Sequence, residues 1–124
     1  MKDIAYSSRH FFENAMRGHK GVLFLEQMDG DVYRIERTND RPPLTVLIAD
    51  IYIMGQGDVY EISGEYYGID AIVLVGFYNR YSCDAKETAK DNGIALFTLN
   101  EFFGALHRTG KSFINYVPRP KENS

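Results

Sequence analysis

The stretch LTVLIADIYIM, residues 44–54, decides the fold that the rest of the sequence suggests. β-Branched and other apolar residues fill almost every position, which favours an extended strand. Since side chains alternate between the two faces of a strand, Val46 and Ile48 share one face, while Leu47 and Ala49 share the other. Both faces are apolar, so we expect one long strand in the middle of a sheet.

Upstream of this strand, the pattern predicts a helix and a hairpin. The helix runs from residue 8 to about residue 17, with Ser7 or Ser8 as its cap. Two strands, 21–27 and 32–37, follow, and the Asp-Gly pair between them is typical of a hairpin turn. The first of these strands is apolar on both faces, so we expect it in a central position of the sheet.

Downstream, strands alternate with helices, which implies right-handed parallel crossovers. The expected elements are a helix that starts at Asp58 and is closed by Gly68, a strand over 69–76, a helix from Ser82 to Asp91, a strand over 94–97, and a helix that the Thr98–Glu101 capping box opens and Gly110 ends. The fold class is therefore α/β, with a mixed β-sheet flanked by helices.

The composition is that of one folded domain. The chain has 124 residues, of which 44% are hydrophobic and 25% charged, so it can bury a core without disulfides. We assign residues 1–110 to the domain and 111–124 to a C-terminal tail, in which 113–117 is a candidate edge strand. Cys83 is the only cysteine, which excludes a disulfide within the chain and a Cys-rich zinc site.

The net charge and the length of the apolar runs limit the classes of partner that we expect. A formal net charge of -3 argues against binding of nucleic acid by bulk electrostatics. The longest apolar run, residues 71–75, is far shorter than the roughly 20 residues that span a bilayer. No apolar leader follows Met1. We therefore expect a cytoplasmic protein without a membrane partner, in agreement with its single cysteine.

The order of elements and several motifs resemble a known family. Asp31-Val32 stands at the second strand, residues 71–77 form a late apolar strand with Gly76 near its end, and a helix with Ala85 and Ala89 leads to Asn92, Gly93, Ile94 and Leu96. Residues 8–108 thereby resemble the Mrr-type branch of the PD-(D/E)xK, or restriction-endonuclease-like, domains, and the resemblance is best over 69–108. It implies an αβββαβ core with an additional βα extension. It also implies a site in which acidic residues of the second and third strands hold a divalent cation beside a lysine.

The third strand departs from this family pattern. In the register that the resemblance gives, Ile48 stands at the metal-binding Glu or Gln, and Asp50 stands at the lysine. An isoleucine cannot bind Mg²⁺, and an aspartate adds negative charge where the transition state already carries an excess. The resemblance therefore implies a catalytically degenerate nuclease-like domain that needs no cofactor. Such a domain would act as a binding or regulatory module, in a nucleic-acid defence or repair assembly.

An active enzyme is the alternative. In that case Asp31 and Asp50 bind Mg²⁺ and, with Glu13, form the rearranged catalytic site of an Mrr-type endodeoxyribonuclease. Lys20 or Lys86 would then replace the missing lysine. The simpler interpretation of Asp50 is a carboxylate that is paired with a basic side chain or solvated at a strand end.

A second set of candidate residues is rich in tyrosine. The candidate recognition surface comprises Tyr60, Tyr67, Tyr78, Arg80 and Tyr81, whereas Tyr66 and Phe77 are expected in the core. Acidic neighbours on the same predicted helix (Asp58, Glu61 and Glu65) favour a protein partner or a homodimer over DNA, which stays an alternative. The competing interpretation is that the tyrosines pack over helix ends.

Overall fold

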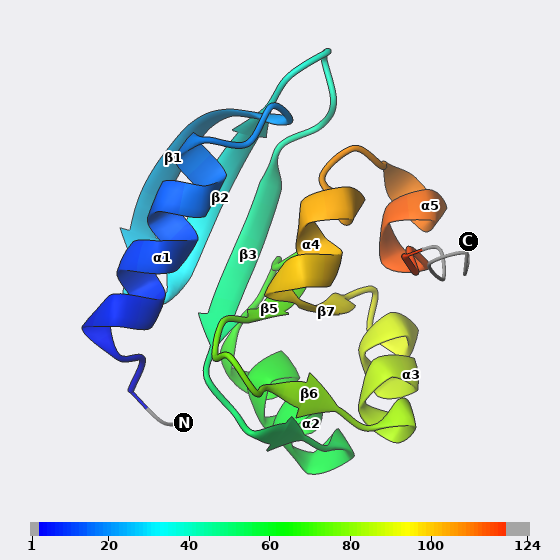
Figure 1. Cartoon of the computed structure of the whole chain (residues 1–124). Coiled ribbons are helices and arrows are strands. Elements are labelled where there is room, and N and C mark those ends of the chain that lie inside the picture. The colour runs from blue at the N-terminus through cyan, green and yellow to red at the C-terminus, as the bar shows by residue number, and fades with distance from the viewer. Residues whose placement is uncertain (1–2, 119–124) are drawn as a thin grey trace, which may run out of the picture.

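A five-stranded mixed sheet forms the centre of the computed structural model, which describes residues 3–118. The strands are β1 (Val22–Asp29), β2 (Val32–Arg37), β3 (Leu44–Ala49), β5 (Ala71–Leu74) and β7 (Ala95–Thr98), in the order β1-β2-β3-β5-β7 (Figure 1). β1, β2 and β3 pair antiparallel, and β3, β5 and β7 pair parallel. Two short strands, β4 (Ile53–Met54) and β6 (Arg80–Tyr81), form a separate parallel pair.

Helices cover both faces of the sheet, which confirms the expected α/β class. The helices α1 (Tyr6–Arg17), α4 (Leu99–Ala105) and α5 (Gly110–Ile114) bury side chains on one face, and α2 (Gln56–Glu65) and α3 (Cys83–Asp91) bury theirs on the other. None of the helices within residues 3–118 combines the length and the apolar composition needed to cross a membrane.

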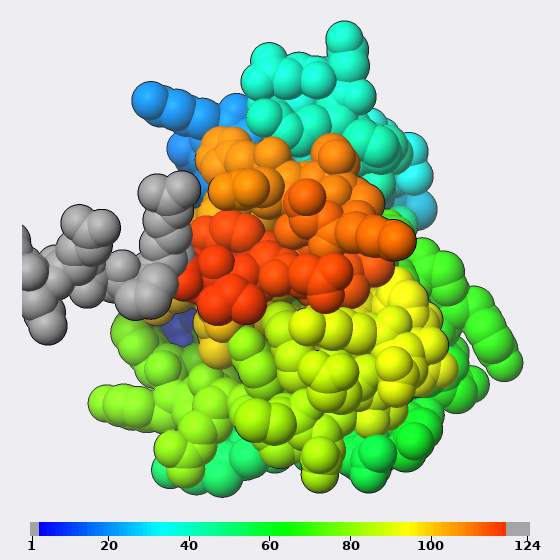
Figure 2. Space-filling view, turned by 90° about the vertical axis from the view of Figure 1, so that its right-hand side faces the viewer, coloured from blue at the N-terminus to red at the C-terminus, as the bar shows by residue number. Residues whose placement is uncertain are grey.

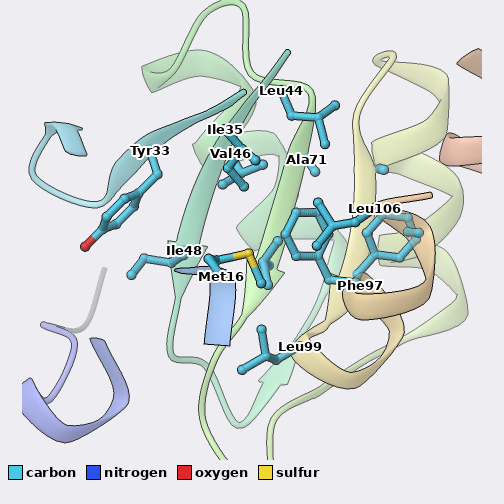
Figure 3. Close-up of a cluster of buried hydrophobic side chains, with 14 of the residues drawn as sticks. Met16, Tyr33, Ile35, Leu44, Val46, Ile48, Ala71, Phe97, Leu99 and Leu106 are labelled. Atoms are coloured by element: carbon cyan, nitrogen blue, oxygen red, sulfur yellow. The ribbon is translucent and has the colours of Figure 1, made fainter. Parts of the chain in front are cut away.

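Because side chains alternate along β3, this strand contributes to two separate hydrophobic cores. Val46 and Ile48 lie in the cluster under α1, α4 and α5, where Figure 3 draws Ile48 near Met16. Leu47 and Ala49 lie in the cluster under α2 and α3. All four of these β3 side chains are fully buried, so β3 is the central strand that its composition predicts.

The predicted long strand over 44–54 is interrupted. β3 ends at Ala49, and the chain bends before it resumes as β4 in the second sheet. The Asn79 side chain holds this bend, because its Oδ1 accepts a hydrogen bond from the Ile51 amide (3.2 Å) and its Nδ2 donates to Asp50 Oδ1 (3.1 Å). A partner 28 residues away thus ends the strand, although the local composition favours its continuation.

The prediction that residues 21–27 form a central strand is wrong. β1 is the outermost strand, and the side chains of Leu23 and Phe24 are 71% and 57% exposed. A register shift between Val22 and Phe24 accompanies this exposure, while Val22 and Leu25 pack against the core. β7 is the opposite edge of the sheet. In the view from the side of α3 and α5, the atoms of α3 (yellow) and α5 (orange-red) lie on the surface (Figure 2).

The helix ends are partly as predicted. Ser82 Oγ accepts a hydrogen bond from the Ala85 amide (3.0 Å), and Thr98 and Glu101 form the expected capping box of α4. α1, however, begins at Tyr6 after an N-cap at Ala5, without the expected serine cap. α2 begins at Gln56, two residues before the predicted start, and ends at Glu65.

The first residues of the segment expected as a tail, 111–114, are helical, and residues 113–117 do not form the candidate edge strand. α4 ends at Ala105, and Gly110 begins α5 instead of ending the preceding helix. Phe113 on α5 is buried against Phe97 and Phe102, so the folded domain extends beyond residue 110. Residues 119–124 of the predicted tail lie outside the described residues.

Candidate functional site

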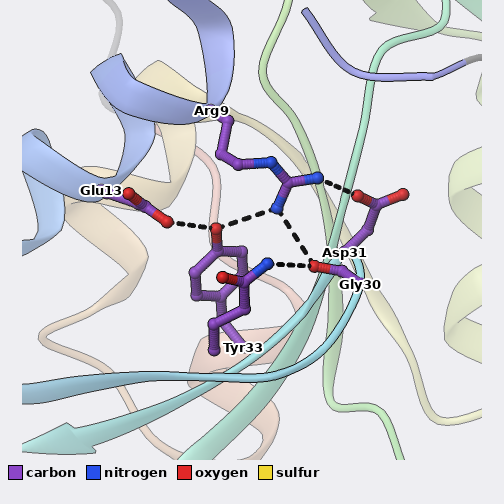
Figure 4. A network of polar contacts seen from close by, with 6 residues as sticks. Arg9, Glu13, Gly30, Asp31 and Tyr33 are labelled. Atoms are coloured by element: carbon purple, nitrogen blue, oxygen red, sulfur yellow. Dashed lines mark hydrogen bonds and ion pairs between the residues drawn. The ribbon is translucent and has the colours of Figure 1, made fainter. Parts of the chain in front are cut away.

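One network of polar contacts joins α1 to the β1–β2 hairpin (Figure 4). The Arg9 guanidinium forms an ion pair with Asp31, and it donates hydrogen bonds to the Tyr33 hydroxyl (2.9 Å) and to the Gly30 carbonyl (3.1 Å). The Tyr33 hydroxyl in turn donates to Glu13 Oε2 (2.5 Å). The structure therefore brings together two of the predicted acidic residues, Asp31 and Glu13.

Burial sets the electrostatics of this network. Burial of Tyr33, followed by its hydrogen bond to Glu13, raises the pKa of the phenol, so the hydroxyl remains a donor. For Arg9, burial lowers the pKa, but hydrogen bonds to Tyr33 and Asp31 raise it by more. The guanidinium thus stays charged beside Asp31.

Local sequence explains why these side chains meet. Arg9 and Glu13 are four residues apart and so lie on the same side of α1. Tyr33 is the second residue of β2, and its ring packs edge-on against Phe12. The enzyme alternative had grouped Asp31 with Glu13, and the i, i+4 spacing of Arg9 and Glu13 was a signal in the sequence, but nothing there indicated that Arg9 would pair with Asp31.

The third predicted acid, Asp50, lies at the end of β3 and is bonded to the Asn79 amide. The start of β2 is close to the end of β3, because the Ile48 amide donates to the Asp31 carbonyl oxygen (2.9 Å). Ile48, the position that the resemblance gives to a metal ligand, is fully buried in the core. Within residues 3–118, no three His, Cys, Asp or Glu side chains are grouped so that they could hold a metal ion.

Two features of the predicted metal site are unfavourable to a divalent cation. Mg²⁺ takes oxygen ligands, and Ile48 offers none. The Arg9 charge lies against Asp31 and would repel a second cation there.

The lysines considered as substitutes lie elsewhere. Lys20 is exposed in the turn after α1. Lys86 on α3 donates from Nζ to the Leu96 backbone oxygen and lies 4.5 Å from the centroid of the Phe97 ring. Burial lowers the pKa of Lys86 to about 8. The Lys86 ammonium group is therefore held against β7 by contacts within the fold.

The tyrosine-rich set divides into exposed and inward side chains. Tyr60 on α2, Tyr67 after α2, and Tyr78 before β6 are 58%, 87% and 82% exposed. The Arg80 guanidinium lies over the Tyr52 ring at 5.4 Å. Tyr81 is half-buried, and its hydroxyl donates to the Glu101 carboxylate (2.8 and 2.9 Å to its two oxygens).

The hydrogen bond from Tyr81 to Glu101 connects β6 to the capping residue of α4, in line with the interpretation that the tyrosines pack over helix ends. Burial, followed by this hydrogen bond, raises the pKa of Tyr81, so its hydroxyl stays protonated. One prediction about this set is wrong. Phe77, expected in the core, is 95% exposed. Its place in a loop after β5, rather than in the strand itself, explains the error.

A cavity that the sequence did not predict opens beside Phe77. Its volume is about 460 Å³, and its walls are the first two turns of α1, the end of β5 with the loop that follows it, and the start of α4. It lies at the carboxyl ends of the parallel strands β5 and β7, a position where α/β sheets often bind ligands. The signal in the sequence was Gly76-Phe77 directly after an apolar strand.

Comparison with known proteins adds no assignment: no family model matches the chain, and neither does any curated protein or solved structure.

Proposed function

We propose that the chain is a binding or regulatory module on a restriction-endonuclease-like scaffold whose metal motif has been lost. The observation that carries this proposal is the position of Arg9. Its guanidinium is bonded to Asp31, to the Tyr33 hydroxyl and to the Gly30 carbonyl. Asp31 is thereby neutralised by a side chain of the same chain, in the place where a nuclease would need a metal-bound carboxylate.

The proposed partner is another protein or a second copy of the chain, in a nucleic-acid defence or repair assembly of the cytoplasm. Exposed tyrosines support this, because Tyr60, Tyr67 and Tyr78 offer large contact areas at low entropic cost. Arg80, which lies over Tyr52, adds a cation to the same kind of surface. DNA is the alternative partner.

An active endonuclease is the second candidate, and one observation favours it. The hydrogen bond from the Ile48 amide to Asp31 brings the start of β2 to the end of β3, so Asp31 and Asp50 belong to the same end of the sheet. A rearrangement that released Asp31 from Arg9 would leave these two carboxylates for Mg²⁺.

Thermal unfolding with and without millimolar Mg²⁺ or Mn²⁺ separates the two candidates, together with incubation of the protein with plasmid DNA. We expect the same melting temperature in both conditions and intact plasmid, because a protein without a metal site gains no stability from the ion. A metal-dependent rise in melting temperature, with cleavage that both Asp31→Asn and Asp50→Ala abolish, would contradict the proposal. Asp31→Asn is the second variant because Asp50 also holds the Asn79 loop.

Sedimentation of the purified chain over a range of concentrations tests the homodimer. We expect a dimer that the double substitution Tyr67→Ser and Tyr78→Ser weakens, since both rings are exposed and contribute little to the fold. A monomer at every concentration would contradict the homodimer and leave a different protein as the proposed partner.

A further inference from the structure

The cavity between α1, α4 and the loop after β5 is bounded by a fixed loop. Asn79 Oδ1 accepts hydrogen bonds from the Gly76 amide (2.9 Å) and from the Ile51 amide (3.2 Å), and its Nδ2 donates to Asp50. A Cβ at Gly76 would collide with the Asn79 side chain and with the Asp50 carboxylate. One wall of the cavity is therefore set by the fold before any ligand binds.

Two aromatic rings stand at the mouth of this cavity. Phe11 comes from α1 and Phe77 from the loop, and their ring centroids are 6.4 Å apart with the planes inclined by 38°. Phe77 is 95% exposed and Phe11 is 54% exposed. A ligand that covers large apolar rings beside a cavity removes their surface from water, and this burial favours binding.

The remaining lining is apolar or polar without charge. Leu74 and Leu99 supply aliphatic surface, and Ser7, Ser8 and Asn100 supply hydroxyl and amide groups. Among the described residues that line the cavity, none is acidic or basic. An ionised ligand would give up its hydration here without meeting an opposite charge in the lining, whereas a neutral polar group finds hydrogen-bonding partners.

We propose that this cavity binds a small, uncharged, planar ring with hydrogen-bonding groups at its edge. The ring packs against Phe11 and Phe77, and its polar edge meets the serine and asparagine side chains at the first turns of α1 and α4. The site is separate from the network around Arg9 and does not rest on the proposed function.

Three probes with one ring and different charges test the proposal: benzamide, benzoate and benzamidinium. We expect benzamide to shift the backbone amide signals of residues 7–11, 74–79 and 98–100 in NMR titrations. We also expect it to bind at least about tenfold more tightly than either charged analogue. Equal affinities for the three probes, or benzamide shifts that map to another part of the chain, would overturn the proposal.

A substitution at Phe77 tests the role of the ring. Because Phe77 is almost fully exposed, Phe77→Ala is expected to leave the melting temperature unchanged while it weakens benzamide binding about tenfold. Tyr60→Ala is the matched control, since it removes an exposed ring from α2, outside the cavity lining. If the two variants bind benzamide equally well, Phe77 forms no part of the site and the proposal fails.

The same ring chemistry occurs in free heterocycles and in protein side chains. Adenosine and N-acetyltyrosinamide, both uncharged at neutral pH, are the two arms that distinguish these sources. Tighter binding of adenosine identifies a free heterocycle, and tighter binding of the tyrosine derivative identifies a side chain of a partner. If neither shifts the signals of the cavity residues, the proposal is overturned.

Discussion

Among single residues, Arg9 makes the largest number of distinct contacts in the network between α1 and the hairpin. Replacing it by methionine keeps most of the aliphatic stem and removes every donor. Asp31 then loses its ion-pair partner and the Tyr33 hydroxyl loses a donor in a part-buried site, whereas the Gly30 carbonyl keeps its hydrogen bond from Gln27. We expect Arg9→Met to lower the free energy of unfolding by about 1–3 kcal/mol, measured by urea denaturation at neutral pH.

The matched control for Arg9 is Arg34→Met. Arg34 pairs with Glu36 across 2.9 Å, but both side chains are more than 40% exposed. Exposed pairs of this kind contribute roughly 0–1 kcal/mol. Equal losses of stability in the two variants would show that the Arg9 network does not stabilise the fold.

Because Lys86 is buried, the free energy of unfolding depends on pH in the alkaline range. Burial lowers its pKa in the folded chain to about 8, whereas the unfolded side chain titrates near its ordinary value of 10.5. Between these values the unfolded chain binds more protons than the folded chain, so the free energy of unfolding rises with pH from about 8 to 10. This contribution is lost as the pH falls through 8, because both states then hold the proton. The expected rise is roughly 1–3 kcal/mol and is measurable by urea denaturation at several pH values.

The groups around Lys86 decide how the pH experiment is controlled. Glu101 and Glu87 raise its pKa and Lys90 lowers it, while Tyr81 lies under the ammonium group at 5.1 Å. The Tyr81 pKa is raised, so its contribution is lost above pH 10 and does not affect the lower window. Lys86→Met is expected to abolish the rise. A rise of the same size in that variant would assign it to another group.

At the scale of elements, the loop after β5 depends on a glycine. Gly76→Ala places a Cβ against Asn79 and Asp50, which must then move and release Ile51. We expect a loss of about 1–3 kcal/mol in the free energy of unfolding, since overpacking typically has this cost. Gly57→Ala in α2 is the control, because its Cβ would meet open space, and we expect it to be neutral or stabilising. A Gly76 variant as stable as the Gly57 variant would show that the loop adapts.

The helix caps could be predicted from the sequence, whereas the ends and positions of the strands could not. The capping groups of α3 and α4 act on amides three residues away, so Ser82 and Thr98 were identified from local sequence alone. The end of β3 depends on its hydrogen bond to the distant Asn79. The exposure of Leu23 depends on the position of β1 at the edge of the sheet, which the packing of the other elements decides. Contacts between distant segments leave no periodic pattern along the chain, and for this reason the cavity and the Arg9–Asp31 pair were missed.

At the scale of the whole molecule, one sheet serves two cores, and β3 is the strand that connects them. Val46 and Leu47 are neighbours on β3, both fully buried, and they point into opposite clusters. Because the hydrogen bonds of β3 to β2 and β5 are common to both clusters, we expect loss of either cluster to unfold the whole domain. Val46→Ala and Leu47→Ala should each lower the stability, by about 1–3 and 2–5 kcal/mol, within a single transition.

Far-UV circular dichroism and tyrosine fluorescence, followed in the same urea titration, test this cooperativity. Coincident transitions in both variants are expected, with Thr45→Ala as a control because Thr45 lies on the same strand and is only half-buried. Leu47→Ala is the more informative variant, since its cluster is the smaller of the two among the described residues and contains no buried phenylalanine. If its dichroism and fluorescence midpoints separate, the face under α2 and α3 unfolds independently. The sheet would then join two units whose stabilities differ, and β3 would not couple them.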